Sequence, residues 1–432
     1  MIKLGEEQNE AISLIKGFIN SERNVFSLGD FKGKDNATIL KDVENSQRRV
    51  FSLQGYAGTG KSTIIKQISE YLEKLNIPYV LCAPTHKAKL VLEILTQREG
   101  MTLHKLLALS PNLEILNLDF NYLEFRANDR SMMFPTNGVI ICDEGSMVSD
   151  DLFNLLLAKA SKFNCKIIFS SDKAQLRPVN AIGHSKVFNV ANGYTLKKIY
   201  RQVSDSGLVS VLPILRESII HRFTDSVGLN GSLLCYNNTL DFFKTALPYF
   251  SKAIKKSDIL ETKFLSYTNN RVNALNGKIR EILFDKNKEY CKHEFLTGNE
   301  NLEFNDFKFW NSMDYVIIDE PKKVDITMPL FMTLPGYSLN LYDYSSKQAA
   351  EISILSKDIS EDYLNSLAYT IDTIRSEAAE LKLQKNKNSG KRWRDYYRLI
   401  ESFTSPVDLY YDNRLIRKKS FDYGYAMTVH RS

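Results

Sequence analysis

Residues 48–63, RRVFSLQGYAGTGKST, decide the fold of this chain. The apolar run VFSL has the composition of a short buried strand. The pattern Gly-x-x-x-x-Gly-Lys-Ser follows at once, from Gly55 to Ser62, and the next residues, IIKQISEYLEKL, place apolar side chains at helical spacing. A strand, a glycine loop and a helix in this order predict a loop that binds the phosphates of a nucleotide.

Nucleotide chemistry explains this spacing. Glycines let the backbone turn tightly and point N–H groups at phosphate oxygens, and the helix N-terminus adds partial positive charge. Lys61 is expected to reach the β- and γ-phosphates, and Ser62 to offer its hydroxyl to Mg²⁺. A glycine turn before an ordinary helix is the alternative. The residues expected to bind ATP here are Gly55, Tyr56, Ala57, Gly58, Thr59, Gly60, Lys61, Ser62 and Thr63.

Composition sets the limits of the interpretation. With 432 residues, 43% hydrophobic and 25% charged, the chain has the profile of a folded globular protein of about three domains. A net charge of +6 permits an anionic polymer as partner but does not require one. The five cysteines form no C-x-x-C pair, and neither a signal peptide nor a membrane span is evident. We therefore expect a cytoplasmic protein without a membrane partner.

Strand-like and helix-like segments alternate from residue 48 to 190, which predicts a doubly wound α/β domain with a parallel sheet. An amphipathic helix over 5–20 precedes it, and residues 21–47 are expected to form a surface insertion. Strands are expected at 50–54, 78–83, 138–142 and 166–170, and helices at 61–75, 86–97 and 149–162.

The second half of the chain repeats part of this pattern. Residues 262–283 read as a strand followed by a helix, which suggests a second α/β domain. Short strand candidates separated by Pro and Gly fill 300–345 and suggest a small β-barrel insert. Residues 346–402 show helical spacing of leucine and isoleucine, so helices are expected there.

Two acids follow the apolar strand that ends at Cys142. Ligands of parallel sheets bind at the carboxyl ends of the strands, so Asp143 and Glu144 are expected beside the glycine loop. Asp143 would hold Mg²⁺, and Glu144 would orient and polarise the attacking water. Acids are also favoured where a strand enters a helix N-terminus, which is the alternative reading. Their combination with the glycine loop favours catalysis.

Gln175 follows another apolar strand, in the sequence SDKAQLRPV. A glutamine at a strand end can hydrogen-bond both a phosphate oxygen and a water, which suits a sensor of hydrolysis. Taken alone, an ordinary polar loop is the more favoured interpretation.

These motifs, in this order, resemble superfamily 1 helicases of the 5′-to-3′ branch, and within it the phage-type Dda-like and RecD-like group. The resemblance extends over nearly the whole chain. The segments that carry it are LGEEQNEAI around Gln8, GYAGTGKS (55–62), APTHKAK (83–89), TLHKLL (102–107), CDEGSM (142–147), SDKAQLRPV (171–179), LKKIYRQ (196–202), LSYTNN (265–270) and AMTVHRS (426–432). Ser171 departs from the glycine usual in the family.

The resemblance implies roles for single residues. Gln8 would read adenine, and Arg201 would act as an arginine finger on the γ-phosphate, beside the catalytic Lys61 and Gln175. Single-stranded DNA would be bound by Pro84, Thr85, His86, Lys87, His104, Thr268, Asn269 and His430. The alternative for His86 and His104 is that they only cap helices.

The resemblance also implies a domain plan. Residues 1–107 and 135–190 would form the first RecA-like motor domain, and 191–299 with 403–432 an incomplete second one. A wedge or pin would occupy 108–134, and a barrel with a helical insert 300–402. The pin tip would carry Phe120, Tyr122 and Phe125, although packing of these rings in a core is at least as favoured.

The function expected from the resemblance is ATP-dependent DNA unwinding. A monomer would move on single-stranded and fork DNA, using ATP and Mg²⁺ at the cleft between two motor domains. Its 5′-to-3′ polarity and its link to DNA replication or repair come from the resemblance alone. The chain stops at Ser432, inside the last motif, so we expect a fragment or half of a split helicase that binds ATP but unwinds poorly. A C-terminal half or replication proteins would then be partners.

Other functions stay open. The chain could be a DNA-stimulated ATPase that remodels protein–DNA complexes, a P-loop small-molecule kinase, or an inactive binding remnant. Residues 385–398, KNKNSGKRWRDYYR, hold six cations against Asp395 and invite nucleic acid, but a solvated basic helix with inward-facing aromatics is equally favoured.

Overall fold

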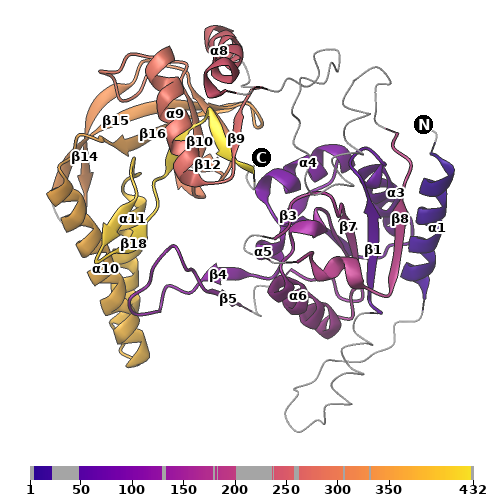
Figure 1. The fold of residues 1–432 in the computed structure, drawn as a ribbon. Coiled ribbons are helices and arrows are strands. Elements are labelled where there is room, and N and C mark those ends of the chain that lie inside the picture. The colour runs from indigo at the N-terminus through magenta and orange to yellow at the C-terminus, as the bar shows by residue number, and fades with distance from the viewer. Residues whose placement is uncertain are drawn as a thin grey trace. The chain divides into compact units, whose positions relative to one another are not determined.

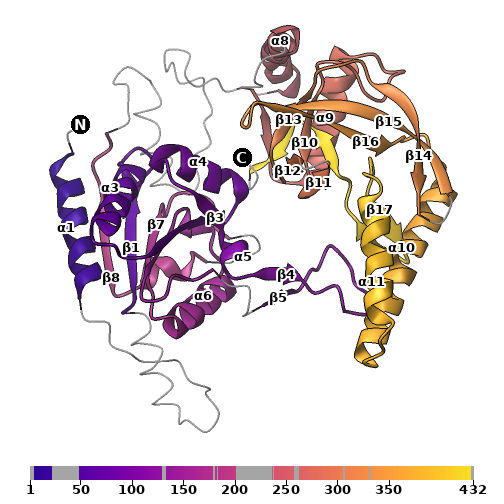
Figure 2. The ribbon, with the colours of Figure 1, turned by 180° about the vertical axis from the view of Figure 1, so that it is seen from behind.

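The structure is a computed structural model that divides the chain into two compact units (Figures 1 and 2). Unit 1 comprises Met1–Ser110 and Ala127–Asn237, and unit 2 comprises Pro111–Arg126 and Asn238–Ser432. The residues described are 4–21, 48–128, 133–178, 181, 183–200, 236, 238–256, 262–304, 307–329 and 332–429. The expected surface insertion at 21–47, beyond residue 21, lies outside them.

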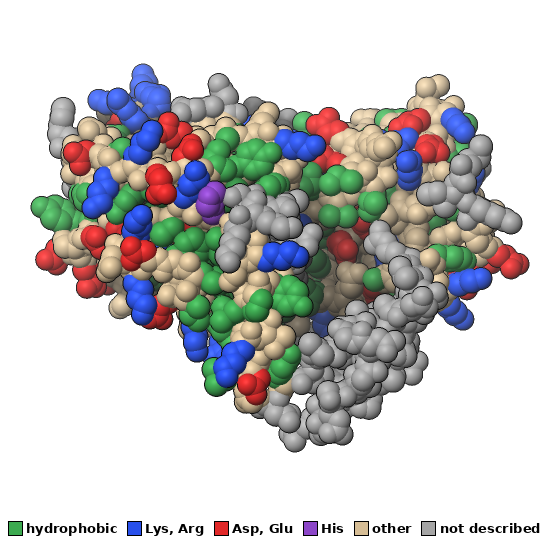
Figure 3. Space-filling model, turned by 90° about the horizontal axis from the view of Figure 1, so that it is seen from above, with side chains coloured by type: hydrophobic (Ala, Val, Ile, Leu, Met, Phe, Trp, Pro, Cys, Tyr) green, Lys and Arg blue, Asp and Glu red, His purple; other side chains and the backbone are tan. Residues whose placement is uncertain are grey.

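The molecular surface carries charges of both signs. On the face seen from above, basic and acidic side chains are interspersed (Figure 3). None of the helices in the described part of the chain combines the length and hydropathy of a membrane span.

Unit 1 is built on a six-stranded sheet in the order β3-β2-β6-β7-β1-β8, and all five strand pairs in it are parallel. Its strands are β1 Val50–Gly55, β2 Tyr79–Ala83, β3 Gly100–Thr102, β6 Val139–Cys142, β7 Lys166–Ser171 and β8 Asn192–Leu196. Its helices are α1 Glu6–Asn20, α3 Lys61–Lys74, α4 His86–Thr96, α5 Leu103–Leu106 and α6 Asp150–Lys162, with short 3₁₀ turns η2 Gly145–Met147 and η3 Lys186–Asn189. The predicted doubly wound α/β fold is confirmed.

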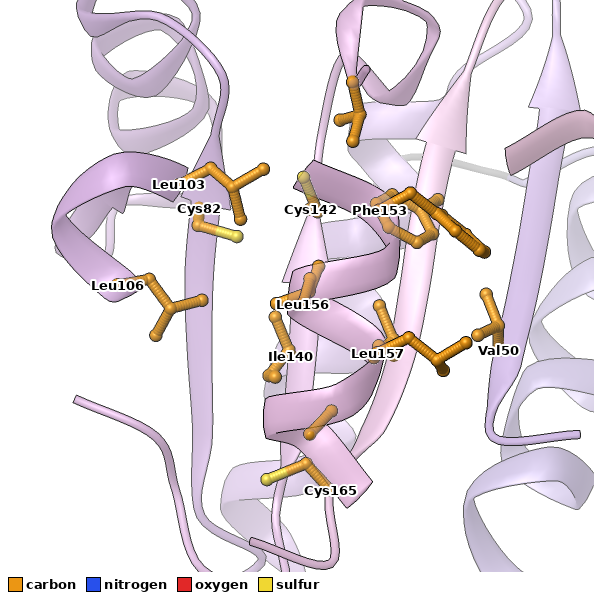
Figure 4. Packing of buried hydrophobic residues seen from close by; sticks show 14 of the residues in the cluster. Val50, Cys82, Leu103, Leu106, Ile140, Cys142, Phe153, Leu156, Leu157 and Cys165 are labelled. Carbon is orange, nitrogen blue, oxygen red and sulfur yellow. The ribbon is translucent and has the colours of Figure 1, made fainter. Parts of the chain in front are cut away.

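Helices cover both faces of this sheet. On one face, α1, α3 and α4 pack their apolar sides on the strands, through residues such as Ile15, Ile64 and Leu92. On the other face, Phe153, Leu156 and Leu157 of α6 lie over Val50 and Ile140 of the strands (Figure 4), in a cluster that α5 also joins. Because both faces are buried, the central strands carry unbroken apolar runs, Val139–Cys142 in β6 and residues 167–169 in β7, which made them readable from sequence.

Parallel pairing brings the carboxyl ends of all six strands to one edge of the sheet. Each of these ends carries one of the recognised motifs. The segments that leave this edge are the glycine loop after β1, Pro84 after β2, Leu103 after β3, Asp143 after β6, Asp172 after β7 and Lys197 after β8.

Unit 2 begins its own α/β element with β9 Phe264–Ser266 and α9 Asn269–Leu283, as predicted, and β9 pairs in parallel with β20 Ala426–Thr428. Asn276 of α9 holds β20 by accepting a hydrogen bond from the Ala426 N–H (2.7 Å) and donating one to its carbonyl (3.3 Å). Helix α8 Thr239–Lys256 precedes them, with Pro248 inside it.

An antiparallel sheet and two helices complete unit 2. The sheet runs β14-β15-β13-β10-β19, with β16 paired to β15. The elements are β10 Phe295–Gly298, β13 Asp314–Ile317, β14 Lys322–Met328, β15 Met332–Asp343, β16 Gln348–Leu355, β19 Phe421–Tyr423, the pairs β11 Leu302–Phe304 with β12 Phe307–Phe309 and β17 Leu409–Tyr411 with β18 Arg414–Arg417, and the helices α10 Glu361–Leu383 and α11 Ser389–Glu401.

The expectation of helices throughout 346–402 was wrong at its start. Residues Gln348–Leu355 form strand β16, which pairs with β15 over eight residues. The sequence QAAEISIL places Ile352 and Ile354 in the core at alternate positions, which is a strand period. The helical spacing is confirmed only from Glu361 onward, in α10 and α11.

The segment 111–126 belongs to unit 2, although short strands β4 Leu109–Pro111 and β5 Phe125–Ala127 at its ends connect it to unit 1 (Figure 1). Arg375 of α10, which is almost fully buried, donates to the carbonyls of Leu113 (3.2 Å) and Ile115 (2.5 Å). The Phe120 N–H donates to the Leu415 carbonyl at 2.8 Å. Hydrogen bonds from buried groups therefore fix this segment on the helical part of unit 2.

We expect Arg375→Leu to lower the free energy of unfolding of unit 2 by about 3–5 kcal/mol, because it removes the donor to two partly buried carbonyls and one of the two arginines that pair with the Asp372 carboxylate. Chemical denaturation measures the loss, and limited proteolysis should cut faster within 111–126. Lys382→Gln is the control, since the Lys382–Glu114 pair is exposed and worth at most about 1 kcal/mol. Equal stability of the two variants would contradict the anchoring role.

Candidate active site

The glycine loop between β1 and α3 has the backbone that phosphate binding requires. Gly58 and Gly60 have φ angles of +86° and +89°, a region that side chains rarely tolerate. The Thr59 hydroxyl donates to the Tyr56 carbonyl (2.8 Å) inside the loop. The Lys61 ammonium donates to the carbonyls of Gly55 (2.7 Å) and Tyr56 (3.2 Å). The lysine thus lies over the loop, where the phosphates of a nucleotide would meet it.

Gln8 lies directly against this loop. Its amide Nε2 donates to the Thr59 carbonyl at 3.1 Å, and its Oε1 accepts from the Gly5 N–H at 2.9 Å. Only 5% of Gln8 is exposed. The first turn of α1 is therefore fastened to the loop by the side chain that the resemblance assigns to adenine. Both ends of the Gln8 amide already bind backbone groups in this structure. The recognition of adenine by Gln8 stays a prediction.

Gly60→Ala is expected to weaken nucleotide binding about tenfold or more. An added Cβ at Gly60 would overlap Nε2 of Gln8, and its φ of +89° would be strained, a combination that costs on the order of 1–3 kcal/mol. Titration with a fluorescent ATP analogue measures the affinity. Gly17→Ala in α1 is the matched control, since nothing lies within 4 Å of a Cβ there. A Gly60→Ala protein with unchanged affinity would contradict the assigned role of the loop.

In the acid pair after β6, Asp143 is buried and Glu144 is partly buried, and the charge of this lysine acts on both. Burial raises the pKa of the Asp143 carboxyl, while the Ser170 hydroxyl and the Lys61 charge act against that rise. Burial, and then the charge of Asp143, raise the pKa of Glu144 to about 7, and Lys61 again opposes the rise. Because one ammonium group acts on both carboxyls, the structure brings Lys61, Asp143 and Glu144 together, as the sequence predicted.

Glu144 has a strained backbone. Its φ is +52° and its ψ is +41°, in the left-handed region that costs a non-glycine residue about 1–2 kcal/mol. The next residue, Gly145, packs so tightly that a Cβ there would lie 2.5 Å from the Ser171 hydroxyl. Such strain concentrates at functional sites, and it turns the chain sharply after β6. Nothing in the local sequence signalled this conformation.

Gln175 is held beside the acid pair by Asp172. The Asp172 carboxylate accepts from the Gln175 amide (3.3 Å) and the Ala174 N–H (2.9 Å), and the Gln175 N–H donates to the Asp172 carbonyl (3.1 Å). The charge of Asp172 also contributes to the raised pKa of Glu144, so this turn lies near Glu144. Gln175 itself is exposed, and its amide can reach a ligand. Asp172 therefore positions Gln175, a contact that the sequence did not reveal.

Two further residues missed by sequence reasoning hold the segment after β8, one to the glycine loop and one to α1. The Tyr200 N–H donates to the Gly58 carbonyl at 2.7 Å. The Glu7 carboxylate accepts from the backbone N–H groups of Lys197 and Lys198, both at 2.9 Å, and these bonds lower its pKa. Tyr200 directly precedes the predicted arginine finger, which was the available signal. Arg201 lies outside the described residues, so its role stays a prediction.

The residues around the acid pair fit a hydrated magnesium ion. In the described part of the chain, the buried hydroxyls of Ser146 and Ser171 have no hydrogen-bond partner. Ser146 follows Glu144 by two residues, and the Ser171 hydroxyl lies against Gly145. A set of hydroxyls and carboxylates is the oxygen chemistry that Mg²⁺ prefers. Ser62 stands in the first turn of α3, at the end of the glycine loop. The donor set therefore matches the predicted ion.

The predicted DNA contacts of unit 1 lie at the same edge of the sheet, after β2 and β3. The Thr85 hydroxyl caps α4 by accepting from the Ala88 N–H at 3.1 Å, and its own hydrogen remains for another acceptor. Burial lowers the pKa of both His86 and His104. The charge of His104 lowers the pKa of His86 further, so the two imidazoles lie near each other. At pH 7 they offer neutral N–H donors, while Lys87 supplies an exposed charge.

The predicted DNA contacts of unit 2 lie where β9 ends. Thr268 and Asn269 are exposed, and the Thr268 hydroxyl caps α9 by accepting from the Arg271 N–H at 3.3 Å. The arrangement repeats that of Thr85 on α4. Pro84 is partly exposed at the corresponding strand end of unit 1, and His430 lies outside the described residues.

Comparisons with known proteins agree with these motifs. The family described as AAA domain matches residues 33–224. The ATP-dependent DNA helicase dda of Enterobacteria phage T4 is 28% identical over 229 residues, which are 52% of this chain and 50% of that protein. The ATP-dependent RecD2 DNA helicase of Deinococcus radiodurans is 30% identical over 143 residues, covering 33% of this chain and 18% of that protein.

A crystal structure of the Pif1 helicase from Candida albicans is similar over 82% of this chain and 79% of its own, at 17% identity and a TM-score of 0.41. This score is low, so the fold assignment rests on the sheet of this chain. The chain spans about half the length of the T4 helicase that it matches. The chain is therefore related to the Dda-like and RecD-like helicases of superfamily 1, as its motifs predicted.

Proposed function

We propose that this chain is an ATP-driven motor that moves along single-stranded DNA and separates duplex DNA, with 5′-to-3′ polarity. The observation that carries the proposal is the convergence at one sheet edge of the glycine loop, Lys61, the buried acid pair and the Gln175 turn. A small-molecule kinase has no need for the Gln175 turn or for a second α/β element. The relatedness to DNA helicases supports the same choice.

In the proposed reaction, water attacks the γ-phosphorus of ATP, the bond to the β–γ bridging oxygen breaks, and ADP and phosphate form. Glu144 orients the water and accepts its proton, and the carboxyl is suited to this because burial brings its pKa to about 7. Lys61 and the loop N–H groups stabilise the charge that develops on the phosphate oxygens. Gln175 is placed to sense the difference between ATP and ADP plus phosphate.

Mg²⁺ would be held by Ser62 and Asp143 and would neutralise charge on the β- and γ-phosphates when bound. For DNA, Thr85, His86, Lys87 and His104 in unit 1 would contact the strand with hydroxyl, N–H and ammonium groups. Thr268 and Asn269 would do the same in unit 2. Thr85 in unit 1 and Thr268 in unit 2 each stand at the N-terminus of a helix, where binding of a phosphate is favoured.

Strand displacement tests the proposal. A labelled duplex with a 5′ tail, one with a 3′ tail and a blunt one are mixed with the chain, with ATP or with a non-hydrolysable analogue. We expect displacement only with ATP and only from the 5′-tailed duplex. Displacement from the 3′-tailed duplex would overturn the polarity. Removal of a tightly bound protein block without any strand displacement would instead favour a remodelling ATPase.

A further inference from the structure

The basic segment at 385–398 forms the end of the helical hairpin of unit 2, and the site described above does not use it. Helix α11 buries Tyr396 and Leu399 against the core that it shares with α10. Its opposite side carries Lys391, Arg394 and Arg398, which are all exposed. Spacings of three and four residues align these three cations in one stripe along the helix, which we call the α11 stripe.

Within the described residues, no acidic side chain forms an ion pair with the α11 stripe. The structure records no ion pair for Lys391, Arg394 or Arg398 with any described residue, whereas Arg392 on the flank of the helix pairs with Glu377 and with Asp395 (3.7 Å). Lys385 and Lys387, in the turn before α11, are exposed as well. This differs from the face in Figure 3, where charges of both signs are interspersed. The row of three unpaired charges is suited to an extended anionic partner. In the absence of such a partner, only counterions balance the charge.

Of the aromatic residues of the segment, Tyr397 is the one whose side chain is exposed, and Tyr396 is buried. Tyr396 is 2% exposed, and Trp393 packs against the core cluster of α10 and α11, with its ring 5.7 Å from that of Tyr396. Trp393 is partly exposed, and Tyr397 is exposed over 43% of its surface. Single-stranded nucleic acid is usually gripped by stacking of bases on aromatic rings, whereas duplex DNA presents mainly phosphates to a binding surface. Three exposed cations on one helix beside a single exposed ring therefore favour duplex over a single strand.

The stripe also borders segment 111–126, within unit 2. Lys382 at the end of α10 pairs with Glu114 at 2.5 Å, and the charges of both influence Tyr397, which lies between Arg394 and Arg398 along α11. Segment 111–126 presents Tyr122 with 81% of its surface exposed and Phe125 with 46%. Arg375 joins this segment to α10, so the exposed rings and the cations belong to the same hydrogen-bonded unit.

We propose that the α11 stripe binds the phosphate backbone of duplex DNA ahead of the point where the strands separate, and so presents the junction to segment 111–126. The presentation of a junction rests on the proposed function. Binding of duplex DNA by the stripe is independent of that function. A helix rises about 1.5 Å per residue, so the stripe spans about 10 Å, enough to contact two successive phosphates of one strand. Lys385 and Lys387 extend the surface beyond α11.

The test replaces the three cations of the stripe in the full chain by glutamine: Lys391→Gln, Arg394→Gln and Arg398→Gln together. Fluorescence anisotropy measures the Kd for a blunt duplex, a 5′-tailed duplex and a single-stranded oligonucleotide over a range of salt concentrations. The control variant is Lys322→Gln, Lys323→Gln and Lys347→Gln, which removes three exposed cations from the antiparallel sheet of the same unit. Circular dichroism melting verifies that both variants fold.

We expect the stripe variant to bind both duplexes about tenfold or more weakly, with the slope of log K against log salt reduced by about 2 to 3, while its Kd for the single strand stays within about twofold. The control variant should match the wild type. Unchanged duplex affinity, or a loss shared equally with the control, would overturn the proposal. A loss confined to the single strand would also overturn it and would assign the stripe to the displaced strand.

The DNA-stimulated ATPase activity of the same proteins separates this proposal from the proposed function. A stripe variant that keeps stimulation by single strands but loses duplex affinity supports both. Duplex affinity that depends on the stripe, in a chain whose ATPase does not respond to DNA, supports the stripe and overturns the motor.

Discussion

Glu144→Gln is expected to lower the rate constant for ATP hydrolysis by about 10²–10⁴, with the Kd for ATP changed less than about threefold. The amide has the shape of the carboxyl and can occupy the strained position after β6, where φ is +52°. It cannot accept a proton from the attacking water. The loop, Lys61 and Asp143, which bind the triphosphate and its ion, are left in place.

Steady-state phosphate release in the presence of a single-stranded oligonucleotide measures this loss, and titration with a fluorescent nucleotide measures binding. Glu99→Gln is the matched control, because Glu99 is exposed on the same unit and belongs to no motif. If Glu144→Gln hydrolysed ATP at the rate of the wild type, the acid pair would have a structural role only, and the chain would fit an inactive remnant better.

Lys61→Ala is expected to weaken ATP binding about 10- to 100-fold and to abolish turnover. A hydrogen bond from a charged donor to a phosphate contributes on the order of 1.5–3 kcal/mol, and the lysine contacts the phosphates that carry the most charge. In the free protein the same ammonium donates to the carbonyls of Gly55 and Tyr56, so its removal also loosens the loop.

Isothermal titration with Mg-ATP and with Mg-ADP separates these contributions, because the loss should be larger for the triphosphate. Lys74→Ala, at the exposed end of the same helix, should bind both nucleotides as the wild type does. An alanine variant at position 61 that loses equal affinity for ATP and ADP would indicate loop disorder and not a lost contact with the γ-phosphate.

The sequence was most informative where burial is uniform. The strands around Val139 and Ile167 are covered on both faces, so each appears as an unbroken apolar run. The glycine loop was readable because its φ angles near +90° at Gly58 and Gly60 exclude other residues. The order of the motifs then predicted the acids and Gln175 at one edge, and in the structure the charge of Lys61 acts on both Asp143 and Glu144. Their catalytic roles stay predictions.

The sequence was least informative where distant segments meet. The hydrogen bonds from Arg375 to Leu113 and Ile115 join residues more than 250 positions apart, and no local pattern marks segment 111–126 as part of unit 2. Tyr122 and Phe125 could equally have been core residues, yet they are exposed. Strand β16 was mistaken for helix because short apolar runs satisfy both periods, and only its pairing with β15 decides between them.

Individual roles also depend on contacts that spacing does not reveal. Thr85 and Thr268 look like DNA contacts in their motifs, and both prove to cap helices, which leaves only the hydroxyl hydrogen for a phosphate. Glu7 and Tyr200 escaped notice because their partners are backbone groups of segments far along the chain. Backbone groups carry no sequence signature, so such contacts become visible only in the folded chain.

The most direct test of a DNA-driven ATP site in this chain is the rate of ATP hydrolysis with and without a single-stranded oligonucleotide, with the Lys61→Ala protein as the blank. The chemistry at the sheet edge and the strand-end contacts predict a rate that rises at least tenfold when the oligonucleotide is added, and a blank that stays at background in both conditions. A rate that is the same with and without DNA, or the same in the blank, would contradict the account.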